Sequence, residues 1–155
     1  MERLLDLSGF YPDEEREIEG NYSFPLPECF DVQGDVNTSF NGNVKFDGTA
    51  YVISADVQSE FFVECARCLK KIPNRLDFSV KEVYNKDDAE DRIDFFEIIV
   101  TSFISEKPLR HLCDESCKGL CPICGKDLNS STCDCIKTNS PFSDEDIKLL
   151  KHTFK

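Results

Sequence analysis

Residues 51–57 read YVISADV, and their apolar side chains recur at every second position. The alternating residues are Tyr51, Ile53, Ala55 and Val57. A period of two residues is that of a β-strand with one buried face. This stretch therefore predicts a half-buried strand. We expect a bulge to break its register where Phe61, Phe62 and Val63 follow one another.

Strand and turn signals lie on both sides of this stretch. Strands are predicted over residues 20–26, over residues 32–40 and along Leu76, Phe78, Val80 and Tyr84. Asn41-Gly42-Asn43 and Asp47-Gly48 are typical of turns. We therefore expect residues 20–85 to form an antiparallel meander or a partly closed barrel.

A helix is predicted over residues 94–105. Asp94 and Glu97 have the spacing of a capping box, and Pro108 is expected to stop the helix. The residues expected on one helical face are Ile93, Phe96, Ile99, Val100, Phe103 and Ile104. That apolar stripe is expected to pack on the sheet, which makes the fold α+β.

The chain divides into three parts on composition. Residues 1–110 are expected to form the β-rich body, in which the acidic stretch DEEREIE at 13–19 is a solvated segment. Residues 111–138 hold six cysteines and few apolar residues. This segment therefore needs a cross-link, such as a bound metal ion, in order to fold. Residues 139–155 predict a polar linker and a short C-terminal helix.

Eight of the nine cysteines lie in closely spaced sets. They are Cys65, Cys68, Cys113, Cys117, Cys121, Cys124, Cys133 and Cys135. The CPxCG sequence at 121–125 is a zinc-knuckle signature, because two intervening residues let both sulfurs face one ion and glycine permits a positive φ. The N-terminal residues MERLLDLSGFYPDEE have none of the features of an export signal, so we expect the chain to stay in a reducing compartment, where cysteines indicate metal or redox chemistry rather than disulfides. A core role for Cys65 and Cys68 stays the alternative, and Cys29 has no evident partner.

Two divisions of these cysteines into sets of four are open. In the first division, one ion is held by Cys121, Cys124, Cys133 and Cys135. The other ion is held by Cys65, Cys68, Cys113 and Cys117. In the second, the pair 65/68 joins the pair 121/124, as in a zinc ribbon. We favour the first, with one or two structural zinc ions. His111 could replace one sulfur, and an iron–sulfur cluster is the less favoured alternative.

The string CKGLCPICGKDLN at 117–129, followed by CDC at 133–135 and preceded by CARCL at 65–69, resembles the YceD family, also called the large ribosomal RNA subunit accumulation protein family. The resemblance covers most of the chain, and the C-terminal motif is its specific part. It implies a role in the accumulation or assembly of the large ribosomal subunit and its RNA. The family is not known as an enzyme, and some of its members lack the later cysteines.

The formal net charge of −12 bears on the partners. Two zinc ions held by eight thiolates would take it to about −16. Nucleic acid and anionic membranes repel such a protein at long range, so a ribosomal protein or a pre-ribosomal large subunit is the expected partner, and direct RNA contact stays open. The candidate contacts are the basic residues Arg67, Lys70, Lys71 and Arg75, for which a solvated strand end is the alternative.

Three function classes are weighed. The first is a cytoplasmic, non-catalytic factor in biogenesis of the large ribosomal subunit. The second is a redox-sensitive zinc-binding chaperone or adaptor, in which oxidised thiolates release zinc. The third, an enzyme, is disfavoured because the sequence has no glycine-rich phosphate loop and no nucleophile elbow, and sulfur-rich closed zinc sites lack an open position.

Overall fold

The computed structural model describes residues 4–87 and 92–135, and the predicted linker and C-terminal helix of residues 139–155 lie outside the described residues. The chain forms two compact units. The first unit comprises Met1–Glu64 and Lys71–His111, and the second comprises Cys65–Lys70 and Leu112–Lys155. The sequence-based division counted residues 65–70 with the β-rich body, whereas the structure groups them with the cysteine-rich segment.

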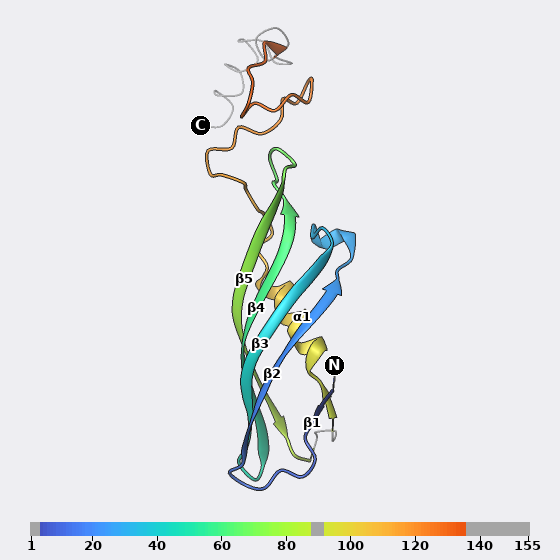
Figure 1. Ribbon diagram of the computed structural model, residues 1–155, viewed down its shortest axis with the longest axis vertical. Helices are drawn as coiled ribbons and strands as arrows, with labels where there is room; N and C mark the ends of the chain where they lie inside the picture. Colours follow the sequence, from blue (N-terminus) through green and yellow to red (C-terminus); the bar gives the residue numbers. More distant parts are fainter. Residues whose placement is uncertain (1–3, 88–91, 136–155) are drawn as a thin grey trace, which may run out of the picture. The chain divides into compact units, whose positions relative to one another are not determined.

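The first unit is built on a four-stranded antiparallel sheet in the order β2-β3-β4-β5 (Figure 1). Its strands are β2 (Glu15–Pro25), β3 (Asp35–Phe46), β4 (Ala50–Glu64) and β5 (Lys71–Asn85). A short 3-10 helix, η1 (Glu28–Phe30), lies between β2 and β3, and a second sheet pairs β1 (Leu4–Asp6) with β6 (Arg92–Asp94). The predicted α+β class is confirmed. The four strands form an open meander, because no pairing joins β2 to β5 within the described residues.

Two local predictions around β2 and β3 are wrong. DEEREIE is not merely a solvated segment, since β2 begins at Glu15 and its side chains alternate between exposed and half-buried. Asn41-Gly42-Asn43 is not a turn, because β3 runs straight through it. Gly42 is required there by a close approach: a Cβ would collide with the carbonyl oxygen of Ser54 and come within 2.5 Å of the Ala55 Cα. The predicted turn at Asp47-Gly48 does join β3 to β4.

The alternation that predicted β4 continues to the end of the strand. The register with β5 is unbroken from Ala50 opposite Asn85 to Glu64 opposite Lys71, so the predicted bulge is wrong. Phe61 is buried and continues the inner face, whereas Phe62 is 44% exposed on the other face. The ammonium of Lys71 lies 4.5 Å from the centre of the Phe62 ring, and this cation–π contact accommodates an aromatic ring at the surface.

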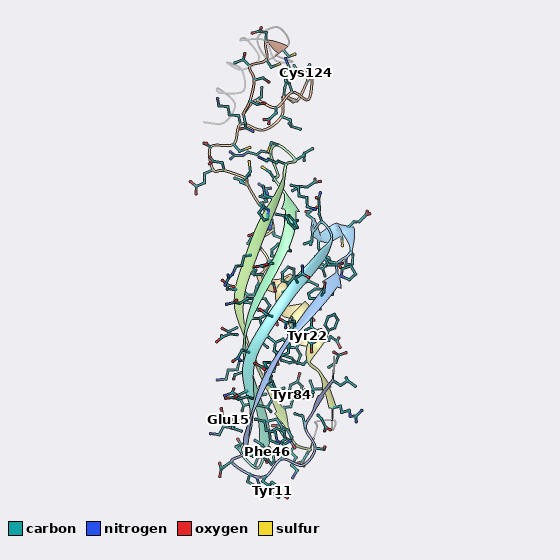
Figure 2. All side chains as sticks on the ribbon, in the orientation of Figure 1. Tyr11, Glu15, Tyr22, Phe46, Tyr84 and Cys124 are labelled. Carbon is teal, nitrogen blue, oxygen red and sulfur yellow. The ribbon has the colours of Figure 1, made fainter. Side chains whose placement is uncertain are left out.

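The helix α1 (Phe95–Glu106) covers one face of the sheet (Figure 1). Its N-cap is Asp94, whose side chain accepts a hydrogen bond of 3.1 Å from the Glu97 N–H, as the capping spacing predicted. Its buried residues are Phe95, Ile99 and Phe103. Two apolar clusters share the helix. Phe95 and Ile99 belong to one, with Phe46 and Tyr51 of the sheet, and Phe103 belongs to the other. Figure 2 shows the side chains on this frame.

Candidate metal centres

The first group of sulfurs in the second unit comes from two distant parts of the chain. Cys65 and Cys68 lie in the loop that follows β4, and Cys113 and Cys117 lie after the helical segment. The Sγ atoms of Cys65 and Cys117 are 3.8 Å apart, and those of Cys68 and Cys113 are 3.6 Å apart. All four sulfurs lie within 4.8 Å of one another.

The second group is local in sequence and consists of Cys121, Cys124, Cys133 and Cys135, whose sulfurs also lie within 4.8 Å of one another. The Sγ atom of Cys133 lies 3.4 Å from that of Cys124 and 3.5 Å from that of Cys121. Cys124, labelled in Figure 2, is the exposed member. The sulfurs are thus grouped as in the first of the two divisions and not as in a pairing of 65/68 with 121/124.

The geometry of both groups fits a structural zinc site. A tetrahedral ion with zinc–sulfur bonds of about 2.3 Å separates its sulfurs by about 3.8 Å, which is close to the distances within each group. A disulfide would need about 2.05 Å, and all nine cysteines are free thiols. Four thiolates per ion are the donor set of closed structural zinc sites.

The two CxxC loops share one backbone arrangement. In the first, Leu69 N–H donates to the Cys65 carbonyl over 2.9 Å, and Cys65 N–H donates to the Lys70 carbonyl over 2.9 Å. In the second, Gly125 N–H donates to the Cys121 carbonyl, and Cys121 N–H donates to that of Lys126, each over 2.8 Å. The first loop, which sequence alone left open as a pair of core thiols, therefore has the knuckle geometry of the CPxCG loop.

The pKa values of the cysteines in the first group favour the binding of a cation, which would neutralise closely spaced thiolates. Backbone N–H groups, chiefly that of Cys113, lower the pKa of Cys65 to about 6. The neighbouring sulfurs of Cys117 and Cys68 raise the pKa of Cys113 to about 12, since a second negative charge is disfavoured beside the first. A bound dication would relieve this repulsion and let all four thiols ionise.

The second group likewise contains one cysteine with a lowered pKa and one with a raised pKa. The backbone N–H groups of Cys124 and Ile123 lower the pKa of Cys121 to about 7. The backbone N–H of Cys135 stabilises the Cys133 thiolate, but the sulfurs of Cys135, Cys124 and Cys121 outweigh it and raise the Cys133 pKa to about 12. Each group thus holds one readily ionised thiol and one whose ionisation needs a cation nearby.

Two polar side chains support the first group, and neither role is visible in the sequence. The Arg67 guanidinium donates to the carbonyls of Glu115 and Cys117 over 3.0 and 2.8 Å, which ties the first knuckle to the later segment. The Asn129 amide donates to the Cys117 sulfur over 3.4 Å and accepts from the Lys118 N–H over 2.7 Å. Such hydrogen bonds orient ligating thiolates.

The remaining sequence candidates lie apart from the sulfurs. His111 belongs to neither group. It is buried in the first unit, with Nδ1 2.5 Å from the Asn74 amide. Cys29 is exposed and also lies outside both groups.

The four basic candidate contacts fall into both units. Arg67 and Lys70 belong to the second unit, and Lys71 and Arg75 belong to the first. Arg67 is engaged with carbonyls of its own unit, as described above. The Arg75 guanidinium pairs with Asp77 over 2.9 Å, and Lys71 lies over the Phe62 ring. The side chain of Lys70 is exposed.

The described part of the chain contains no helix long and apolar enough to cross a membrane.

Fold and site together define a β-rich protein with a cysteine-rich second unit that presents two four-sulfur groups. Residues 53–146 match the family model described as Large ribosomal RNA subunit accumulation protein YceD. The match covers more than half of the chain and includes all eight grouped cysteines, and the chain belongs to the YceD family. Comparisons with curated proteins and with solved structures gave no match.

Proposed function

We propose that this protein is a non-catalytic factor in the accumulation of the large ribosomal subunit and its RNA, with two structural zinc ions in its second unit. The observation that carries the proposal is the family match over residues 53–146, which spans both sulfur groups. The family's description supplies the link to large-subunit ribosomal RNA. We place the protein with the ribosome in the cytoplasm.

The zinc ions are proposed to hold together a segment that has little core of its own. Among the residues described in the second unit, the buried ones are Cys65, Cys117, Gly119 and Cys121. Three of these four are proposed ligands, so metal would replace the missing apolar core. The ion at Cys65, Cys68, Cys113 and Cys117 would join the loop after β4 to the C-terminal segment.

The proposal of a non-catalytic role rests on the ligand set. Four sulfurs around an ion leave no position for water or substrate, whereas catalytic zinc keeps one position open. The acidic charge supports a protein partner over RNA. A basic ribosomal protein, alone or within a pre-ribosomal large subunit, has the complementary charge.

Depletion tests the proposed role. Cells lacking the protein are expected to show a lowered ratio of large-subunit to small-subunit ribosomal RNA, and the protein is expected to co-sediment with large-subunit precursors. A Cys113→Ser/Cys117→Ser variant should fail to restore the ratio, whereas Cys29→Ser, a matched change at a cysteine outside both groups, should restore it. A normal ratio after depletion, with no co-sedimentation, would contradict the proposal.

The alternative of a redox-sensitive chaperone draws on one observation. Cys113 and Cys124 are exposed, and exposed thiolates are those that oxidants reach first. Peroxide would then release zinc and give the protein the ability to suppress aggregation of an unfolded client. We favour the ribosomal role because the family description supports it. Suppression of client aggregation after oxidation, together with normal ribosomal RNA levels after depletion, would instead favour the chaperone.

A further inference from the structure

The outer edge of β2 carries no partner strand. β2 pairs with β3 along its whole length, and no described strand pairs with its other side. Exposed strand edges present unpaired N–H and C=O groups. Another chain can pair with these groups unless the edge is covered or otherwise protected. Residues 17–22 of this edge line a groove.

The ladder with β3 shows which backbone groups point outward. Phe46 N–H donates to the Glu14 carbonyl over 2.9 Å, and the register then proceeds in single steps without a bulge. In an antiparallel pair, alternate residues bond to the partner strand. The even-numbered residues of β2 therefore bond to β3, and Glu17, Glu19 and Asn21 direct their N–H and C=O groups to the open edge.

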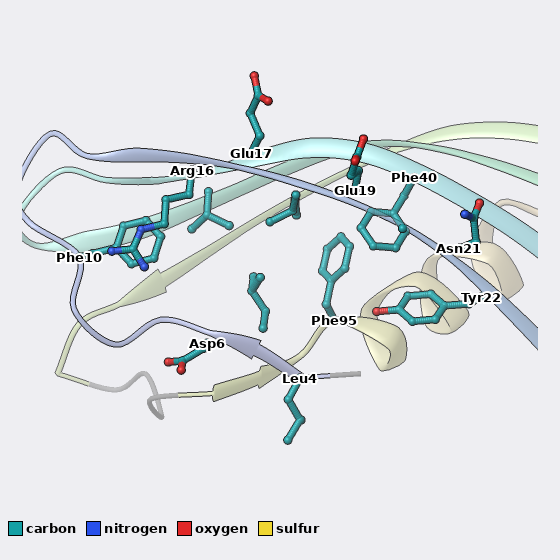
Figure 3. Close-up of a pocket in the computed structure, with 14 residues that line it drawn as sticks. Leu4, Asp6, Phe10, Arg16, Glu17, Glu19, Asn21, Tyr22, Phe40 and Phe95 are labelled. Carbon is teal, nitrogen blue, oxygen red and sulfur yellow. The ribbon is translucent and has the colours of Figure 1, made fainter. Parts of the chain in front are cut away.

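The groove beside this edge lies between β1 and β2 and has a volume of about 560 Å³. Its wall on one side includes Leu4 and Leu5 of β1. Its floor is apolar and includes Phe40, Val44 and Phe95 of the main core cluster. Figure 3 shows Phe40 and Phe95 turned into this space. Six residues of open strand edge match the length of an ordinary strand, so the groove has room for one extended segment.

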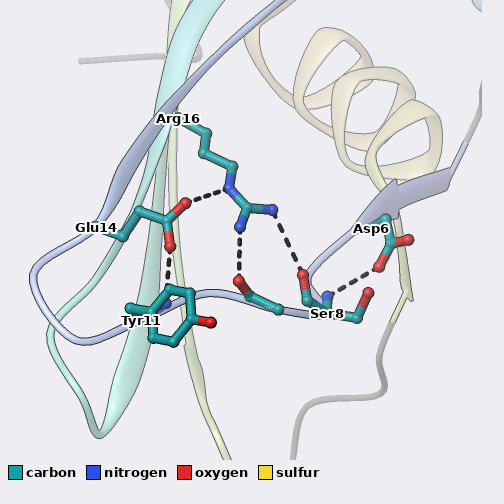
Figure 4. A network of polar contacts seen from close by, with 6 residues as sticks. Asp6, Ser8, Tyr11, Glu14 and Arg16 are labelled. Carbon is teal, nitrogen blue, oxygen red and sulfur yellow. Dashed lines mark hydrogen bonds and ion pairs between the residues drawn. The ribbon is translucent and has the colours of Figure 1, made fainter.

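Arg16 lies at one end of the groove and forms hydrogen bonds to the connection between β1 and β2. Its guanidinium donates to the Glu14 carboxylate over 2.6 Å and to the carbonyls of Gly9 and Ser8 over 2.8 and 3.4 Å (Figure 4). It also lies 3.8 Å from the centre of the Phe10 ring. These contacts hold the connection between β1 and β2 in place, so the groove is preformed at this end.

The rim of the groove is acidic. Glu17 and Glu19 are exposed and point away from the groove in Figure 3. The residues opposite them on β3 are the neutral Asn43 and Asn41. Neither glutamate has an ion pair within the described residues.

We propose that this groove binds an extended, basic segment of a partner protein, which adds as a strand to the edge of β2. Alternate apolar side chains of the segment would enter the groove toward Phe40 and Phe95. The intervening Lys or Arg side chains would lie on the outer face beside Glu17 and Glu19. Backbone hydrogen bonds to residues 17–21 provide binding, and the alternation of apolar and basic residues provides selectivity.

Charge distinguishes this occupant from two others. A second copy of the chain, added edge to edge, would bring the Glu17 and Glu19 side chains of both copies together, and like charges directly opposite are destabilising. Nucleic acid would bring phosphates to the same acidic rim. The inference stands on the groove, the edge and the charge, and it does not depend on the proposed role in ribosomal RNA accumulation.

A direct test uses a probe peptide of alternating lysine and valine, about eight residues long to match an ordinary strand. A peptide with glutamate in place of lysine is the control for charge. Binding to the full-length, zinc-loaded protein is followed by fluorescence anisotropy at low and high salt, and the bound site is located from NMR shifts of backbone amides. We expect the lysine peptide to bind, to weaken with salt, and to shift the amides of residues 17–22.

Two pairs of variants separate the charge from the strand edge. Glu17→Lys/Glu19→Lys should weaken binding by roughly tenfold or more, while Glu28→Lys/Glu82→Lys, which changes the net charge equally, should stay within about twofold. Asn21→Pro removes one outward N–H and should also weaken binding by about tenfold, while Asn21→Val keeps that N–H and should bind normally.

The outcomes are distinct. The proposal would be overturned if Glu17→Lys/Glu19→Lys bound the lysine peptide as well as the control Glu28→Lys/Glu82→Lys does. It would also be overturned if the amide shifts fell outside residues 17–22, or if the glutamate peptide bound as tightly as the lysine peptide. If Asn21→Pro does not fold, the charge pair and the amide shifts still decide, because Glu17 and Glu19 are exposed. Dimerisation of the unmodified protein through this edge, seen by sedimentation, would favour a second copy instead and would also overturn it.

Discussion

Leu69 and Gly125 occupy the same position in two loops of the same geometry. Each follows the second cysteine of a CxxC pair, and each donates its N–H to the carbonyl of the first cysteine. Leu69 has φ 59° and Gly125 has φ 70°, both in the left-handed region. Glycine adopts this conformation without strain, whereas leucine pays about 1–2 kcal/mol.

Exchanging the residue at this position should therefore act in opposite directions in the two knuckles. Gly125→Ala should destabilise the second unit by about 1 kcal/mol through backbone strain alone, because a Cβ there meets nothing within 4 Å. Leu69→Gly should be neutral or stabilising by up to about 1 kcal/mol, since it removes strain and the side chain is 60% exposed.

Thermal unfolding together with zinc competition by a chelator measures both effects. Gly34→Ala is the matched control, because Gly34 has φ 83° and equally open space but belongs to the first unit. It should lower stability without changing zinc affinity. Equal loss of zinc affinity in Gly34→Ala and Gly125→Ala would show that the knuckle geometry has no special role.

Asn129 is expected to tune the first group through its hydrogen bond to the Cys117 sulfur. Asn129→Ala should weaken zinc binding there by roughly 10–100-fold, which is the usual effect of removing a donor behind a metal ligand. Asn129→Asp keeps an acceptor for the Lys118 N–H but places a negative charge beside the sulfur, so it should be at least as harmful. Zinc titration against a colorimetric chelator reports both. Wild-type affinity in Asn129→Asp would show that the bond to sulfur is unimportant.

Gly42 should tolerate no side chain. Gly42→Ala is expected to destabilise the first unit by about 1–3 kcal/mol, because its Cβ would overlap the backbone of Ser54 and Ala55. Asn41→Ala, an exposed neighbour in the same strand, should change stability by less than about 0.5 kcal/mol. Chemical denaturation compares the two variants. A stable Gly42→Ala protein would contradict the close approach of β3 and β4.

Sequence patterns located the elements whose signals are local. The alternation from Tyr51 onward identified β4, and the spacing of Asp94 and Glu97 identified the start of α1. Both signals depend on neighbours within a few residues, so one sequence suffices to detect them. The same locality caused the errors at Gly42 and Phe62. The Gly42 signal of a turn is local, whereas the approach of Ala55 that explains the glycine is not.

The candidate site shows the same limit. The spacing of Cys121 and Cys124 identified one knuckle, but two divisions of the cysteines remained open because spacing says nothing of contacts across 45 residues, as between Cys68 and Cys113. Arg67 was predicted as a contact for a partner, and the structure places its guanidinium on carbonyls of its own unit. The supporting role of Asn129 and the pairing of β1 with β6 depend on contacts between distant segments, which no local pattern encodes.

Removing metal should loosen the two units unequally. A chelator is expected to raise backbone amide exchange in residues 65–70 and 112–135, because these segments have little apolar core of their own. Strands β2 to β5 and α1 should keep most of their protection, since they share the buried clusters around Phe46 and Phe103. Hydrogen exchange followed by mass spectrometry measures this. Uniform loss of protection in both units would contradict the separation.

The most direct test of the account is the zinc content of the purified protein and of three variants, measured by native mass spectrometry. We predict two ions in the wild type, one in Cys65→Ser/Cys68→Ser, one in Cys133→Ser/Cys135→Ser, and two in the control Cys29→Ser. The ion left in Cys133→Ser/Cys135→Ser should be lost on further mutation of Cys113 and Cys117. Wild-type protein without zinc, or an ion in that variant that depends on Cys121 and Cys124 instead, would contradict the account.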